Sequence, residues 1–173
     1  MSFGMFKPLE PHIEPHILDS GDRTKFETGA VRDMREGKGR CDLMPLDIVA
    51  DLLDNDIVLR EISEFVVDRD VDHLYSALKR FAVVNYDGSA QTMVLEVSKH
   101  FEEGAKKYGE NNWQKGIPTR CYIDSAVRHY LKWLRSDHDE PHDRAFVWNI
   151  MCCIWTCMNI ETVIEAEEGE NDA

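Results

Sequence analysis

The sequence has no apolar run that approaches the length of a membrane span, and its start, M-S-F-G-M-F-K-P, lacks the charged-then-apolar layout of a signal peptide. Its five cysteines are odd in number and form no C-x-x-C pair, which argues against a disulfide framework. Cys152, Cys153 and Cys157 fall in an apolar run, which predicts buried thiols that pack as small hydrophobic groups. We therefore expect a cytoplasmic protein (in the host cytoplasm if a phage encodes it) that does not contact membranes.

Basic residues are scarce, because 20 Lys and Arg face 33 Asp and Glu and the formal net charge is -13. Such a negative balance argues against binding to a nucleic acid polymer. The charge is unevenly spread: residues 97–135 contain eight basic and four acidic residues, whereas residues 161–173 contain six acidic and no basic ones. A basic segment in an acidic chain favours a compact anionic ligand.

The 173 residues suit one domain with a real core. Apolar residues at helical spacing, together with turn and capping signals, predict helices at about 46–55, 57–65, 71–84, 89–108, 120–134 and 142–165. No convincing strand is found, so we predict an all-α helix bundle. Prolines and the absence of periodicity indicate an extended arm over residues 1–26, followed by a domain over 27–165 and an acidic tail over 166–173. The long apolar last helix predicts a homo-oligomer, a dimer or larger.

The helix predicted at 89–108 carries mixed polar groups. Glu103 and Lys107 share one face at a spacing of four residues. The adjacent acids Glu102 and Glu103 are hard oxygen ligands suited to Mg²⁺ or Mn²⁺, although a solvated charge face is the alternative. Asn112 and Trp113 follow in a loop, where the amide could read a purine edge and the indole could stack on a base or join the core.

The next two helices add further groups. Asp124 and Arg128 lie four residues apart and could form an ion pair. Alternatively, Arg128, beside His129, could bind phosphate oxygens. The last helix opens with the E-x-x-D spacing of Glu140 and Asp143, where acids are also ordinary partners of a helix N-terminus. Earlier, the glycine-rich runs 29–33 and 37–40 combine flexible backbone with cations, a composition that suits phosphates but does not match the P-loop pattern.

The chain resembles the phage and bacterial dATP/dGTP diphosphohydrolase-type domain, which is similar to the MazG-like all-α nucleotide pyrophosphohydrolases. The matching pieces are G-A-V-R-D (29–33), G-K-G-R (37–40), L-M-P (43–45), H-F-E-E-G-A-K-K-Y-G-E-N-N-W (100–113), S-A-V-R-H (125–129) and the H-D-R-A-F-V-W-N run (142–149). The resemblance implies Mg²⁺- or Mn²⁺-dependent hydrolysis of purine deoxynucleoside triphosphates, dGTP or dATP, to the monophosphate and pyrophosphate. The superfamily's E-E-x-x-E pattern is matched by Glu102 and Glu103, whereas Lys106 occupies the third acidic position.

The resemblance and the residue chemistry together define the candidate site. The metal candidates are Glu102, Glu103, Glu140, His142 and Asp143. The catalytic candidates are Glu103, Lys107, Asp124 and His129. The substrate-binding candidates are Arg32, Lys38, Arg40, Lys107, Asn112, Trp113, Arg128 and Asn149.

Two other functions fit the sequence. Lys106 in place of an acid favours a protein that binds or sequesters nucleotides without turnover. The His142-Asp143 dipeptide, with His100 or His129, is compatible with a histidine-aspartate phosphohydrolase, which would release triphosphate. A purely structural interaction protein is the remaining alternative.

Overall fold

A computed structural model describes residues 21–34 and 36–160. Residues 1–20 of the predicted arm and the whole predicted acidic tail lie outside this range. The elements in chain order are β1 (Arg23–Lys25), β2 (Val31–Asp33), the 3-10 helix η1 (Cys41–Leu43), α1 (Leu46–Leu52), α2 (Ile57–Asp68), α3 (Val71–Asn85), α4 (Ala90–Tyr108), the 3-10 helix η2 (Asn112–Lys115), α5 (Thr119–Leu134) and α6 (His142–Asn159).

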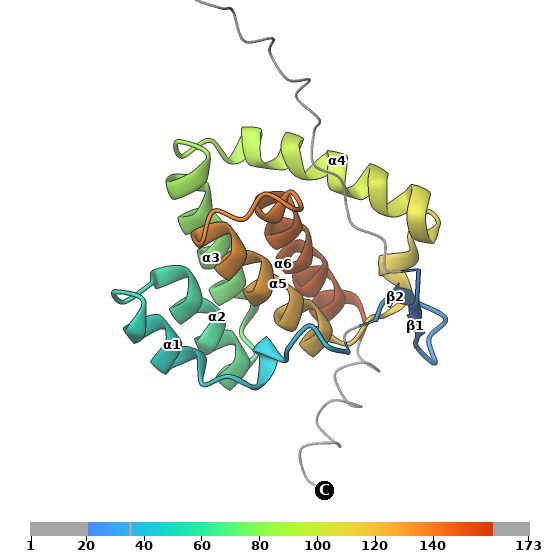
Figure 1. Cartoon of the computed structure of the whole chain (residues 1–173), viewed down its shortest axis with the longest axis horizontal. Helices are drawn as coiled ribbons and strands as arrows, with labels where there is room; N and C mark the ends of the chain where they lie inside the picture. The colour runs from blue at the N-terminus through green and yellow to red at the C-terminus, as the bar shows by residue number, and fades with distance from the viewer. Residues whose placement is uncertain (1–20, 35, 161–173) are drawn as a thin grey trace, which may run out of the picture.

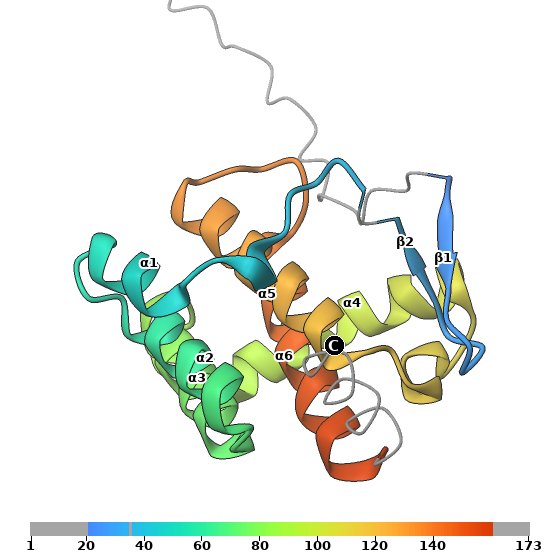
Figure 2. The ribbon, with the colours of Figure 1, turned by 90° about the horizontal axis from the view of Figure 1, so that it is seen from below.

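The described residues form a helix bundle, as predicted (Figure 1). Helices α5 and α6 pack side by side in the centre, and α3 and α4 both contact α6. Helices α1, α2 and α3 form one end of the molecule, while β1 and β2 lie at the other end, beside the end of α4 (Figures 1 and 2). The central pair α5–α6 is therefore flanked by the helical end on one side and the hairpin on the other.

The helix boundaries follow local chemistry. Asp56 and Ser89 cap α2 and α4, because their side chains accept hydrogen bonds from the backbone N–H groups of Leu59 and Thr92. Helix α1 ends at Leu52, earlier than predicted, and the residues that follow include two with left-handed backbone, Asp54 and Asn55. Helix α6 ends at Asn159; the rest of the predicted helix, residues 161–165, lies outside the described part.

The core lies where the apolar faces of α2, α3, α5 and α6 meet. Phe81 is fully buried and makes edge contacts with Tyr130, Trp133 and Phe146, an arrangement that aromatic rings favour. The predicted packing of thiols in the core is confirmed for Cys152 and Cys153, which are fully buried. Among the described residues, no helix combines the length and the apolar character that crossing a bilayer requires.

A short hairpin is the part of the fold that the sequence did not predict. Strand β1 pairs antiparallel with β2, so residues 23–25, which were assigned to the arm, belong to a folded element. Each strand has three residues, too few to show an alternating apolar pattern. The expectation that the chain has no strand was therefore wrong.

Candidate functional site

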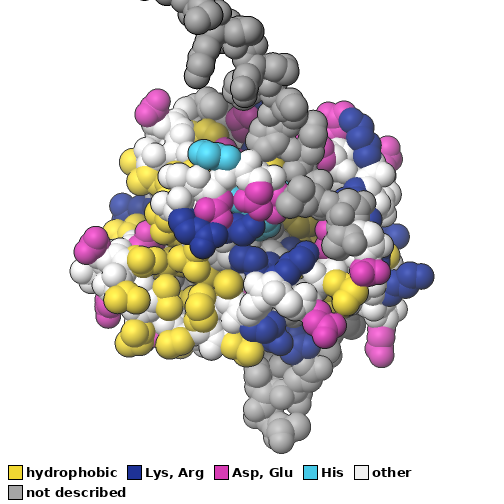
Figure 3. Space-filling model, in the orientation of Figure 1, with side chains coloured by type: hydrophobic (Ala, Val, Ile, Leu, Met, Phe, Trp, Pro, Cys, Tyr) yellow, Lys and Arg dark blue, Asp and Glu magenta, His cyan; other side chains and the backbone are white. Residues whose placement is uncertain are grey.

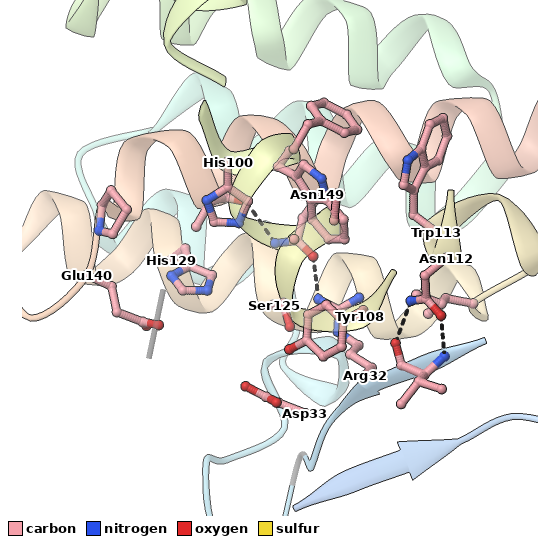
Figure 4. A pocket seen from close by; sticks show the side chains of 18 of the residues that line it. Arg32, Asp33, His100, Tyr108, Asn112, Trp113, Ser125, His129, Glu140 and Asn149 are labelled. Atoms are coloured by element: carbon pink, nitrogen blue, oxygen red, sulfur yellow. Dashed lines mark hydrogen bonds between the residues drawn. The ribbon is translucent and has the colours of Figure 1, made fainter. Parts of the chain in front are cut away.

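A cavity of about 850 Å³ opens between the hairpin, α4, η2, α5 and the start of α6. Its volume falls within the range usual for small-molecule sites. Figure 4 shows side chains from these elements facing one another, with Glu140 and His129 at one end and Asn112 and Trp113 at the other. The cavity therefore brings together segments that are far apart in the sequence.

Charged and aromatic side chains share the cavity wall. The basic residues that line it are Arg32, Lys38, Arg128 and Lys132. The acidic ones are Asp33, Glu102, Glu110 and Glu140, and the aromatic ones are Phe101, Tyr108, Trp113 and Trp148. Lys and Arg side chains also gather across the middle of the face seen in Figure 3, where Figure 1 shows α5. A wall of this composition suits a ligand that has both a flat ring and an anionic group.

Arg32 projects from β2 into the centre of the cavity. Its Nη2 donates to Asn149 Oδ1 at 2.5 Å, and its guanidinium lies 5.2 Å from the Tyr122 ring centre and 5.8 Å from that of Trp148. The buried Nη1 has no hydrogen-bond partner among the described residues. A charged donor without a partner is costly, so this nitrogen is a natural contact for an anionic oxygen.

Asn112 fixes the strand that carries Arg32. Its Nδ2 donates to the Val31 carbonyl at 2.7 Å, and its Oδ1 accepts from the Val31 N–H at 2.9 Å (Figure 4). The side-chain amide thus takes the place of a neighbouring strand. Thr28 Oγ1 adds a hydrogen bond to the Gly116 carbonyl at 2.7 Å. Asn112 lines the cavity, but both ends of its amide are used in holding the hairpin.

The loop that carries Asn112 and Trp113 depends on left-handed backbone. Gly109 and Gly116 have φ values of 90° and 93°, which glycine adopts without steric cost. Trp113 makes edge contacts with Phe101 and Trp155, at centroid distances of 5.6 and 5.0 Å. Its indole is therefore anchored in an aromatic cluster and still forms part of the cavity wall.

Asp124 and Arg128 form an ion pair on α5, as one of the two interpretations of their spacing predicted. Asp124 is fully buried and also accepts the Cys41 N–H at 2.8 Å, so it ties the chain at η1 to α5. Arg128 lines the cavity and donates to the Gly39 carbonyl at 3.3 Å. Arg40, by contrast, pairs with Asp42 and is not part of the cavity wall.

Lys107 is also held by an acid rather than placed in the cavity wall. Its Nζ lies 2.7 Å from Asp33 Oδ2, and Arg23 contacts the other oxygen of Asp33 at 2.8 Å. Burial and the nearby Asp33 carboxylate raise the pKa of the adjacent Tyr108 well above its ordinary value, so this phenol stays neutral. The negative charge that Asp33 adds to the cavity wall is therefore compensated within the protein by two cations.

His129, Glu140 and His142 meet at the other end of the cavity. One ligand atom from each lies within 4.8 Å of the other two, a separation that one metal ion can bridge. The two histidine Nδ1 atoms are 2.9 Å apart, and His142 Nε2 is 2.8 Å from Asp139 Oδ1. Burial, followed by the neighbouring His142, lowers the pKa of His129 well below its ordinary value, so its imidazole is neutral.

The other predicted acids do not join this group. Glu102 pairs with Lys106 at the surface, although it also lines the cavity mouth. Glu103 lies 3.9 Å from Arg144, and Asp143 accepts a hydrogen bond from the Tyr86 hydroxyl at 2.9 Å. The adjacent acids Glu102 and Glu103 therefore face different partners, and so do Glu140 and Asp143.

Comparison with models of protein families finds a match over the second half of the chain. The family model described as dATP/dGTP diphosphohydrolase, N-terminal, matches residues 76–166, which is more than half of the chain. The chain belongs to this dATP/dGTP diphosphohydrolase family. No curated protein and no solved structure matches it. The match spans α4, α5 and α6, whereas the hairpin and Lys38 precede it.

Three residues that line the cavity of this dATP/dGTP diphosphohydrolase family member were not among the metal, catalytic or substrate-binding candidates; of these, His100 was considered only for the alternative histidine-aspartate phosphohydrolase. Lys132 lies one turn after Arg128, on the same side of the helix. Trp148 precedes Asn149 and looked like part of the apolar helix. His100 begins the H-F-E-E run, lines the cavity and has a buried Nδ1 without a hydrogen-bond partner in the described part of the chain.

Proposed function

We propose that this protein hydrolyses purine deoxynucleoside triphosphates, dGTP or dATP, to the monophosphate and pyrophosphate, with Mg²⁺ or Mn²⁺ as cofactor. The observation that carries the proposal is the cavity itself, which combines basic side chains, aromatic rings and the His129–Glu140–His142 group. Most of its wall lies in the segment that matches the dATP/dGTP diphosphohydrolase family.

The basic residues would hold the phosphate chain. Arg32 offers Nη1, which has no hydrogen-bond partner in the described part of the chain, and Asp124 fixes Arg128 at the wall through their ion pair. Guanidinium groups bind phosphate oxygens well because their donors form a planar fork. Lys38 and Lys132 add charge on the same wall. The base would lie toward the aromatic end, against rings such as Trp113 and Trp148.

The reaction would add the oxygen of a water molecule to the α-phosphorus and break the bond to the oxygen that bridges to the β-phosphorus. The leaving pyrophosphate gains negative charge, which Arg32 and Arg128 would stabilise. His129, Glu140 and His142 fit a metal ion, since their ligand atoms converge. When bound, the ion would supply Lewis-acid chemistry and lower the pKa of water.

A product assay tests the proposal. The full chain is incubated with each of the four deoxynucleoside triphosphates and Mg²⁺ or Mn²⁺, and the products are separated by anion-exchange chromatography. We expect the monophosphate and pyrophosphate from dGTP or dATP. Deoxynucleoside with triphosphate, or orthophosphate as the only phosphate product, would contradict the proposal.

Two arginines near the start of the chain offer a matched pair of variants. Arg32→Gln removes a donor from the cavity and should lower kcat/KM by about 100-fold, as loss of one charge-stabilising donor typically does. Arg40→Gln removes the same charge outside the cavity wall, where Arg40 pairs with Asp42, and should leave kcat/KM within about twofold. Equal losses in both variants would show that the effect is not specific to the cavity.

The same assay separates the alternative functions. A sequestering protein would bind the nucleotide without forming products. A histidine-aspartate phosphohydrolase would release triphosphate, but His142 faces His129 whereas Asp143 is bound by Tyr86. Lys106, which motivated the sequestering alternative, forms its ion pair with Glu102 at the surface. We therefore keep hydrolysis to pyrophosphate as the proposal.

We also propose that the protein is a homo-oligomer. Apolar side chains gather over α1 and α2 on one face (Figure 3). The exposed apolar residues of these helices include Ile48 and Leu52 in α1 and Ile57 in α2. Contiguous exposed apolar surface is typical of interaction sites. Sedimentation of the full chain and of Leu52→Glu should show an oligomer that the substitution weakens; a monomer in both cases would contradict the proposal.

A further inference from the structure

The end of the cavity at the α5–α6 connection brings two imidazoles and a carboxylate together. His129 lies in α5, Glu140 precedes α6, and His142 is its first residue. The packing of α5 against α6 places the two Nδ1 atoms 2.9 Å apart. Glu140 contributes a carboxylate oxygen to the group, whose ligand atoms all lie within 4.8 Å of one another.

Asp139 determines which nitrogen of His142 is available. His142 Nε2 lies 2.8 Å from Asp139 Oδ1, and a carboxylate can only accept, so Nε2 carries the proton. The Nδ1 lone pair of His142 then accepts a hydrogen bond from His129 Nδ1, which an ion bound between the two nitrogens would replace. Lys132 Nζ holds the other oxygen of Asp139 at 2.8 Å. Histidines that bind metals commonly donate their second N–H to a carboxylate in this way.

We propose that His129, Glu140 and His142 form a binding site for a first-row transition-metal ion such as Mn²⁺, and that this site prefers such an ion to Mg²⁺. Imidazole nitrogens bind the divalent first-row transition metals, of which Mn²⁺ binds least tightly, whereas Mg²⁺ prefers oxygen ligands. Two nitrogens bound at right angles, each about 2.1 Å from an ion, would be about 3.0 Å apart, close to the 2.9 Å observed. This inference identifies the metal class of the proposed hydrolase site.

The other acidic residues near the cavity are less suited to binding this metal ion. Asp137, Asp139 and His142 also converge, but there Asp137 is bound by Arg135 and Asp139 by Lys132. His142 Nε2, the nitrogen next to Asp139, already donates to that carboxylate. Glu102 pairs with Lys106 at the surface. The His129–Glu140–His142 group, in contrast, includes two residues of the cavity wall.

Metal binding can be measured without nucleotide. The full chain is freed of metal with a chelator and titrated with MnCl2, and the loss of the free Mn²⁺ electron paramagnetic resonance signal is followed, alone and in competition with MgCl2. We expect one tight Mn²⁺ per chain and Mg²⁺ binding at least about tenfold weaker. His129→Gln and Glu140→Gln should each weaken Mn²⁺ binding at least about tenfold, while Glu102→Gln, the control, should not change it.

Asp139→Asn tests the orienting role. It removes the fixed acceptor for His142 Nε2 and should weaken Mn²⁺ binding by about 10- to 100-fold while broadening or shifting the bound-Mn²⁺ spectrum. Thermal melting confirms that each variant is folded. Glu140 is only partly buried, so its variant keeps the test decisive if a histidine variant fails to fold.

The outcomes separate this site from the proposed function. Equal affinity for Mg²⁺ and Mn²⁺, or Mn²⁺ binding that survives His129→Gln and Glu140→Gln, would overturn the site even if dGTP is hydrolysed. Tight, histidine-dependent Mn²⁺ binding without any hydrolysis would support the site and contradict the hydrolase proposal.

Discussion

Replacing His100 by glutamine should remove a defined part of the protein's pH-dependent stability. Burial, followed by the nearby Arg144 and Arg32, lowers the pKa of His100 from 6.5 to about 3. Below pH 6.5 the unfolded chain binds a proton at this residue that the folded protein does not bind. This difference in proton binding at His100 therefore lowers the free energy of unfolding as the pH falls from about 6.5 toward 3. Between pH 8 and pH 5 the cost is about 2 kcal/mol, since each pKa unit corresponds to about 1.4 kcal/mol.

Urea denaturation of the full chain and of His100→Gln, followed at pH 8, 7, 6 and 5 with a chelator present, measures this contribution. The wild-type free energy of unfolding should fall by about 2 kcal/mol more than that of the variant over this range. The comparison uses the change with pH, so the absolute stability of the variant does not matter. Identical pH dependence in the two proteins would refute the argument that His100 is neutral because it is buried among cations.

Other outcomes follow from the contacts around the cavity. Asp124→Ala leaves Arg128 without its buried partner and should lower the free energy of unfolding by about 3 kcal/mol in urea denaturation; a loss below about 1 kcal/mol would contradict the role given to this pair. Asn112→Ala removes both hydrogen bonds to Val31 and should raise the Kd for dGTP at least about tenfold, as isothermal titration calorimetry would show, because it releases the strand that carries Arg32. Raising KCl from about 50 to 500 mM should weaken dGTP binding several-fold, since salt screens the cations of the cavity; unchanged affinity would argue against phosphate binding there.

The helices were predictable because each amphipathic helix buries one face. In α4, for example, Met93 and Val97 lie one turn apart and are both buried. The hairpin was not predictable from local pattern, since the side chain of Asn112, far along the chain, supplies the hydrogen bonds that β2 uses. Helix periodicity depends on neighbouring residues, whereas the hairpin depends on a contact made only in the folded chain.

The candidate site was predictable in composition but not in arrangement. Arg32 and Arg128, chosen as phosphate ligands, line the cavity, and so does Trp113. Adjacent helical residues point about 100° apart, so the sequence could not show whether Glu102 or Glu103 faces the cavity. The approach of His129 to His142 depends on how α5 packs against α6, which no local spacing reveals.

A crystal structure with Mn²⁺ and a dGTP analogue that cannot be cleaved between the α- and β-phosphorus atoms would locate both the metal and the substrate. We predict an anomalous manganese peak among His129, Glu140 and His142, the triphosphate against Arg32 and Arg128, and the base at the aromatic end of the cavity. Manganese at Glu102 or Glu103, or a nucleotide bound outside the cavity, would contradict this prediction.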